Sequence, residues 1–229
     1  MTRGVFLVAI MFVRPMLLPS ALRLSQFSQS YSTKRFVSQK QYTAASSDTK
    51  HGEEEAMRTT RSWIDEFVVK LKLCPFADAA MKNSVSMRCY NGTSESELVK
   101  IVEEELLKMA EWKETEEASG ATAFVIAADM FPDFLSYMHF ANERIDSLLA
   151  EHDLHGTLQV AHFHPAFQFH GNDPCDPHNK VNRSPFPMFH ILREEEVTRA
   201  SDLMDTESIW RRNEKLMRRL LRSPTQHVK

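Results

Sequence analysis

The sequence contains few cysteines and glycines. Its 229 residues include 3 Cys and 6 Gly. No Cys-x-x-Cys pair occurs, which argues against a disulfide-rich scaffold and a zinc ribbon. The absence of a tandem or heptad repeat excludes collagen-like, solenoid and coiled-coil proteins. No apolar run reaches the roughly 18 residues of a membrane-spanning helix, so we expect no integral membrane protein. With 42% apolar and 26% charged residues, the composition indicates an ordinary soluble globular protein.

Acidic residues are absent from the first 47 positions, which are rich in Ser and Thr and carry spaced arginines. That composition is typical of an organellar transit peptide, a cationic segment drawn to an anionic membrane. We therefore interpret residues 1–50 as a disordered transit peptide for the mitochondrion, with a plastid as the alternative destination. Two other interpretations stay open: a secretory signal built on the apolar residues 5–13, and an extension without an address.

The net charge of −3 is the sum of two basic terminal segments and an acidic central one. Residues 1–50 carry a net +6, residues 51–208 a net −15 and residues 209–229 a net +6. Because an acidic body repels a phosphate backbone, we expect no nucleic-acid partner.

Hydrophobic periodicity predicts the elements of one folded domain, residues 51–229. The predicted helices are 53–73, 94–117, 132–152, 194–204 and the basic helix 209–221, and the predicted strands are 85–90, 121–128, 157–164 and 188–192. Two strand–helix–strand crossovers imply neighbouring parallel strands, and the last strand returns antiparallel after a long loop, 165–187. We predict an α+β fold: a two-layer sandwich with a mixed sheet of about four strands and helices mainly on one face. The residues expected to be buried are Trp63, Phe67, Phe124, Ile126, Val160 and Ile191.

The most distinctive segment is 162–178, which holds four of the ten histidines. Together with flanking blocks, it carries a resemblance to a known family. The matching blocks are Leu73-Cys74-Pro75-Phe76-Ala77, Leu158-Gln159-Val160-Ala161 with Phe163-His164-Pro165, Gln168-Phe169 with Gly171, and Asn182-Arg183-Ser184-Pro185-Phe186-Pro187-Met188 with His190 and Leu192-Arg193-Glu194. Over about residues 60–215 the chain resembles the uncharacterised family catalogued as domain of unknown function 1415. This resemblance implies no activity, cofactor or site.

A metal site is one hypothesis for the histidines. His162 and His164 lie two residues apart on a predicted strand, so their rings point to one face. With His190 and Asp173 they would supply ligands that suit a catalytic zinc or iron. The alternative is that His164 caps the strand end by hydrogen bonding and that the other histidines are solvated.

A nucleophile is a second hypothesis. Cys74 lies at a helix end beside Pro75, and His164 or His190 would take the proton from its thiol. The alternative is core packing, because free cysteine is among the most buried residue types.

An anion-binding site is the third hypothesis. Asn182, Arg183 and Ser184 offer an amide, a guanidinium fork and a hydroxyl, which suit a carboxylate or phosphate. The alternative is that Arg183 pairs with Asp173 or Asp176 and pins the loop to the sheet.

Together these patterns predict a small enzyme acting on an anionic small molecule, with its site under the 165–187 loop. His164 and His190 would transfer protons or bind a metal, Arg183 would hold the substrate, and Cys74 would line the pocket floor. His170 and His178 would lie outside, on the solvent side. The alternative is a non-catalytic binding or assembly module in which the same residues brace the loop. An enzyme requires His164, Arg183 and His190 to converge on an open concavity.

Overall fold

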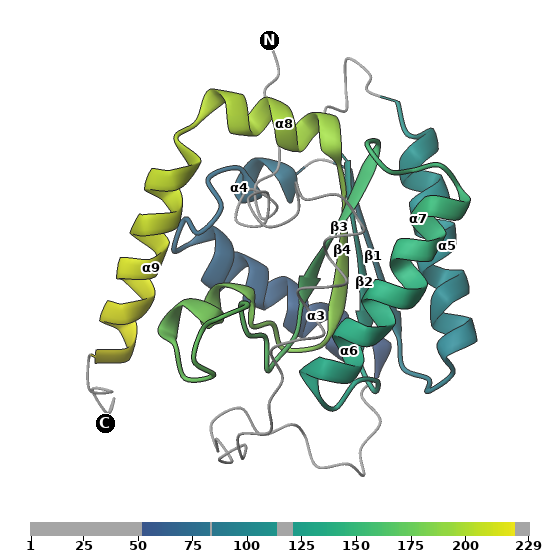
Figure 1. The fold of residues 1–229 in the computed structure, drawn as a ribbon, viewed down its shortest axis with the longest axis horizontal. Coiled ribbons are helices and arrows are strands. Elements are labelled where there is room, and N and C mark those ends of the chain that lie inside the picture. The colour runs from purple at the N-terminus through teal and green to yellow at the C-terminus, as the bar shows by residue number, and fades with distance from the viewer. Residues whose placement is uncertain (1–51, 83, 114–120, 223–229) are drawn as a thin grey trace.

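A four-stranded mixed sheet lies at the centre of the computed structural model, which describes residues 52–82, 84–113 and 121–222 (Figure 1). The predicted transit peptide, 1–50, lies outside the described residues. The strands are β1 (Ser84–Tyr90), β2 (Ala121–Ala127), β3 (Leu158–Phe163) and β4 (Met188–Arg193). Each strand begins and ends within one residue of its predicted position.

The last strand of the chain lies inside the sheet. The strand order is β1-β2-β4-β3. β1 pairs with β2 in parallel, as predicted, and β4 runs antiparallel to both β2 and β3. The prediction that β3 lies next to β2 is therefore wrong. β4 takes that inner position because its side chains are buried on both faces of the sheet.

The order of helices and strands along the chain is close to the predicted one. They are α3 (Glu53–Trp63), the π-helix η2 (Ile64–Val69), α4 (Ala77–Ala80), α5 (Glu95–Glu111), α6 (Phe134–Phe140), the π-helix η3 (Ala141–Ile145), α7 (Asp146–Glu151), the 3-10 helix η4 (Pro177–Asn182), α8 (Glu194–Leu203) and α9 (Thr206–Arg222). The hydroxyl of Ser94 caps α5 by accepting from the backbone N–H of Glu97. Among the described helices, none has the length and apolar character needed to cross a bilayer.

The α+β class and the mixed four-stranded sheet are confirmed, but the helices cover both faces of the sheet. Figure 1 places α5, α6 and α7 on one side and α3, α4, α8 and α9 on the other. Side chains of β2 alternate between two core clusters: Phe124 and Ile126 face α3 and α8, whereas Val125 and Ala127 face α5 and α6. A strand that is apolar on both faces needs a cover on both, which makes three layers instead of two.

Four of the six predicted core residues are buried: Phe124, Ile126, Val160 and Ile191. The other two, Trp63 and Phe67, are only partly buried and stack on each other at the edge of the α3 side of the core.

Candidate functional site

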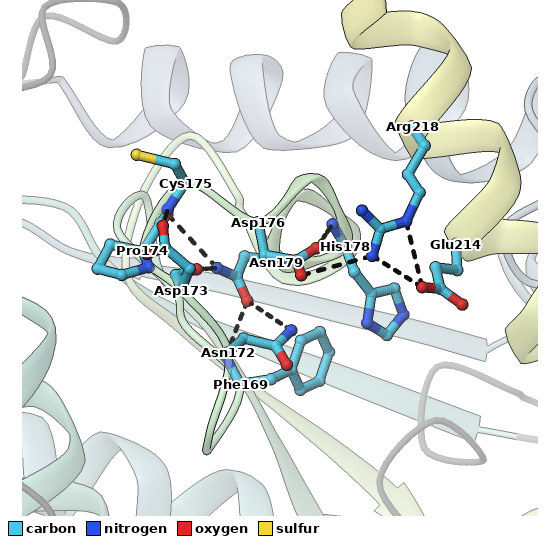
Figure 2. Close-up of polar contacts among 10 residues, drawn as sticks. All are labelled: Phe169, Asn172, Asp173, Pro174, Cys175, Asp176, His178, Asn179, Glu214 and Arg218. Atoms are coloured by element: carbon cyan, nitrogen blue, oxygen red, sulfur yellow. Dashed lines mark hydrogen bonds and ion pairs between the residues drawn. The ribbon is translucent and has the colours of Figure 1, made fainter.

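The 165–187 loop is a folded unit with the amide side chain of Asn179 at its centre. Asn179 is fully buried, and its Oδ1 accepts from the backbone N–H of Phe169 at 3.0 Å and from Nδ2 of Asn172 at 3.3 Å. Its Nδ2 donates to the carbonyl of Asp173 at 2.8 Å. Figure 2 shows Asn179 at the centre of these contacts. The loop therefore has a fixed shape without belonging to the sheet.

A 3-10 helix, η4, forms the second half of the loop. Asp176 caps it by accepting from the N–H of His178 at 2.8 Å, and Pro177 occupies its first turn. The Asp-Pro pair is a helix-start signal that the sequence offered and that the prediction of an irregular loop missed.

Arg183, the C-cap of η4, braces the loop through backbone carbonyls. Its Nε donates to the carbonyl of Phe167 at 3.0 Å and its Nη2 to that of Pro174 at 2.7 Å. The alternative interpretation, a pairing of Arg183 with Asp173 or Asp176, is not found among the ion pairs of the described residues. Asp173 accepts from the backbone N–H of Cys175, and Asp176 lies 3.6 Å from Arg218 on α9.

No carboxylate of the described residues lies within ion-pair distance of Arg183 or of Lys180. Burial lowers the pKa of the Lys180 ammonium, and the positive charge of Arg183 lowers it further. Burial likewise lowers the pKa of Arg183. The two cations thus lie close together, and no carboxylate in the described part of the chain neutralises either of them.

Lys180 was not among the predicted site residues. The signal in the sequence is the Asp-Pro helix start, because the 3-10 helix that it begins places Lys180 in the turn before the C-cap, Arg183.

Asn182 and Ser184, the predicted companions of Arg183, are buried in the loop. The amide nitrogen of Asn182 donates to the carbonyl of His162 at 3.1 Å. The hydroxyl of Ser184 donates to the carbonyl of Phe186 at 2.5 Å. Both side chains stabilise the exit and return of the loop, which leaves Arg183 as the member of the trio nearest to solvent.

His164 is fixed between two backbone groups. Its Nδ1 accepts from the N–H of Ala166 at 3.0 Å, so Nε2 carries the proton and donates to the carbonyl of Phe131 at 2.9 Å. Burial lowers its pKa. With both ring nitrogens engaged, this neutral tautomer has no lone pair for a metal and no site for proton exchange.

His190 lies on the opposite face of the sheet from His164. Its ring stacks on Phe124 at 4.1 Å, and its Nε2 lies 2.5 Å from Oγ1 of Thr122. The ring of His164 instead lies 5.4 Å from that of Tyr137, on the α6 side. Burial lowers the pKa of His190 to about 3. The structure therefore does not bring His164, Arg183 and His190 to one pocket.

The other candidates are dispersed as well. His162 shares the face of His164, as predicted, but it is buried, and burial lowers its pKa to about 4. Cys74 packs in the core cluster on the α3 side. Within the described ranges, no three His, Cys, Asp or Glu side chains are placed to hold a metal ion. Of the two histidines expected outside the site, His170 is exposed but His178 is 5% exposed.

The family profile described as "Protein of unknown function (DUF1415)" matches residues 55–227. The chain belongs to this family. The match confirms the resemblance carried by the sequence blocks, and within the DUF1415 region lie the whole loop, η4 and α9. No curated protein and no solved structure matches the chain. A function for this DUF1415 protein is therefore inferred from the geometry of the loop.

Proposed function

We propose that this protein is a non-catalytic binding module whose ligand is an anionic small molecule held by Lys180 and Arg183. The observation that carries the proposal is the pair of neighbouring, partly buried cations that no carboxylate of the described residues neutralises. Like charges placed together cost free energy unless a counter-charge arrives. A carboxylate or phosphate would supply that counter-charge and accept charge-assisted hydrogen bonds.

The bracing of Arg183 supports the same function. Its bonds to the carbonyls of Phe167 and Pro174 fix the guanidinium in place and leave other N–H groups of the fork without a partner among the residues that the structure describes. A cation that is already ordered loses little side-chain entropy on binding, which favours affinity. Arg183 can therefore stabilise the loop and bind an anion at the same time.

A binding module is favoured over an enzyme because of the histidines. Catalysis by His164 and His190 requires ring nitrogens that reach a common substrate. His164 donates and accepts through backbone bonds, and His190 lies across the sheet. The acidic charge of residues 51–208 favours a small anion over a nucleic acid as the ligand.

The experiment is thermal unfolding of residues 51–229 with sodium phosphate, sulfate or citrate at matched ionic strength. An anion that binds the native state raises the Tm. Lys180→Gln removes a charge that makes no hydrogen bond or ion pair with the described residues and that Arg183 repels, so stability without ligand should not fall. Loss of one charge-assisted contact, about 1.5–3 kcal/mol, should weaken the apparent affinity about tenfold or more. The matched control is Lys100→Gln on the exposed face of α5.

Arg183→Lys separates the two uses of the arginine. It keeps the charge but loses the fork, so it should lower both the stability and the anion affinity. If no anion raises the Tm of the parent, or if Lys180→Gln and Lys100→Gln behave alike, the binding proposal is wrong and the loop is only braced.

We also propose import into the mitochondrion, with a plastid as the alternative, because residues 1–50 carry spaced arginines and their first 47 positions lack acidic residues. A fusion of residues 1–50 to a fluorescent protein should accumulate in the organelle, and the same fusion with its arginines changed to glutamine should not. Cytosolic or secreted fluorescence of the unaltered fusion would contradict import.

A further inference from the structure

The surface between η4 and α9 is built around His178. Its ring stacks on Phe169 at 4.8 Å with an interplanar angle of 16°, and the ring of Trp210 on α9 meets it edge-on at 5.0 Å. The side chain is 5% exposed. Within the described residues, Nε2 is buried and has no hydrogen-bond partner. Two aromatic rings thus enclose an imidazole whose Nε2, if both ring nitrogens were protonated, would bury an N–H without an acceptor among the described residues.

Three charged groups face this ring from the two elements. Arg218 of α9 lies 3.6 Å from Asp176, the N-cap of η4, and 2.9 Å from Glu214 of its own helix (Figure 2). Glu214 and Asp176 favour a protonated His178, whereas Arg218 opposes it. Burial is the largest influence and lowers the pKa of His178. Protonation is therefore less favourable while η4 is docked on α9 than when the ring is in water.

α9 is anchored independently of this contact. Arg212 donates to the carbonyls of Leu71 and Lys72, both at 2.7 Å. Asn213, which is fully buried, donates to the carbonyl of Leu73 at 2.8 Å. When the contact at His178 is lost, α9 keeps these bonds, so the displacement falls on η4, which is then held by the bond of Asn182 to the carbonyl of His162 and by the contacts of Asn179 within its own loop.

We propose that η4 and α9 form a proton-sensitive latch: protonation of His178 releases η4 from α9 and loosens the anion site that η4 carries. The first step stands on the contacts of His178 alone. The second step rests on the proposed function, because Lys180 and Arg183 keep their spacing only while η4 is ordered. Both cations stay charged across the range in which histidine titrates, so loss of anion binding in mild acid would come from the latch.

The direction of the effect follows from the lowered pKa. Free histidine titrates near pH 6.5. Above that value both states are neutral and the latch is closed. As the pH falls below it, the released ring takes up a proton before the docked ring does, and release becomes more favourable. The latch therefore opens in mild acid.

The test is hydrogen exchange of the 165–187 loop at pH 8.0 and 5.5, corrected for the intrinsic pH dependence of exchange, with peptides of β2 as the internal reference. In the parent, loop exchange should rise several-fold at pH 5.5 while β2 stays protected. His178→Phe preserves the stack between Phe169 and Trp210 but cannot titrate, so it should abolish the rise. His155→Gln, at an exposed histidine, should leave the rise intact.

A second variant, Glu214→Gln, tests the latch if His178→Phe does not fold. Glu214→Gln removes a carboxylate that favours protonated His178 in the docked state, so loop exchange at pH 5.5 should rise further and exchange at pH 8.0 should not change. Equal loop exchange at both pH values in the parent, or a rise that persists in His178→Phe, overturns the latch.

Sulfate, which keeps its charge over this range, separates the latch from the proposed function. Weaker sulfate binding at pH 5.5 in the parent, restored by His178→Phe, supports both steps. Sulfate binding at neither pH, together with exchange that still responds to His178→Phe, rejects the anion site and leaves the release of η4 standing. Sulfate binding that is equal at both pH values overturns the second step.

Discussion

Asn179 supplies to the 165–187 loop the hydrogen-bond partners that a helix or strand would give to its own backbone. A buried N–H or carbonyl without a partner is costly, and Asn179 satisfies the N–H of Phe169 and the carbonyl of Asp173 with one side chain. Arg183 does the same for the carbonyls of Phe167 and Pro174. A loop built in this way can hold a functional side chain in place outside the sheet.

Asn179→Ala should therefore destabilise the protein by about 2–4 kcal/mol, because it leaves buried backbone groups without partners. Urea unfolding should show a lower midpoint with an unchanged m-value. Asn172→Ala is the matched control, since its side chain donates a single bond, to Asn179 itself, and it should cost less. Equal stabilities of the two variants would contradict the central role of Asn179.

At the scale of elements, the position of β4 decides what the sequence could and could not predict. Periodicity and length placed all four strands, because apolar runs and turn residues are local signals. Register is not local. Ala161 pairs with His190 across β3 and β4, and cross-strand partners share a face. His162 and His164 therefore face away from His190, and the site predicted from sequence could not form. The Lys180–Arg183 pair depends on the 3-10 helix η4, whose Asp-Pro start lies in the sequence but whose residues the prediction left as loop.

Ile126 and Ile191 test the three-layer arrangement, because they face different core clusters and neither is exposed. Each change to Ala should cost about 2–5 kcal/mol in the free energy of unfolding. Since the two residues share no cluster, the double variant should lose the sum of the two single costs. Leu107→Ala, at a side chain that is 39% exposed, is the control and should cost far less. A negligible cost at either isoleucine would mean that one face of the sheet is uncovered.

Over the whole molecule, buried histidines tie stability to pH. Burial lowers the pKa of His162 to about 4 and that of His190 to about 3, whereas histidine in an unfolded chain titrates near 6.5. Both side chains lie in the core on opposite faces of the sheet. At a pH between the lowered pKa of each histidine and about 6.5, the unfolded chain binds protons that the folded protein does not. Folding therefore becomes less favourable as the pH falls through this range.

His162→Phe isolates one of these contributions. The ring keeps its place beside Tyr137, whose hydroxyl retains its bond to the carbonyl of Met188 at 2.8 Å. Stability of the parent is fully present above about pH 6.5 and declines from there to about pH 4, with each buried histidine contributing about 1.4 kcal/mol per pH unit. The variant should therefore show a shallower decline over this window, measured by urea unfolding at pH 7.5, 6.0 and 5.0. His155→Gln, at an exposed side chain, should retain the slope of the parent. Parallel curves for His162→Phe and the parent would mean that His162 is protonated in the folded protein, despite the burial that lowers its pKa.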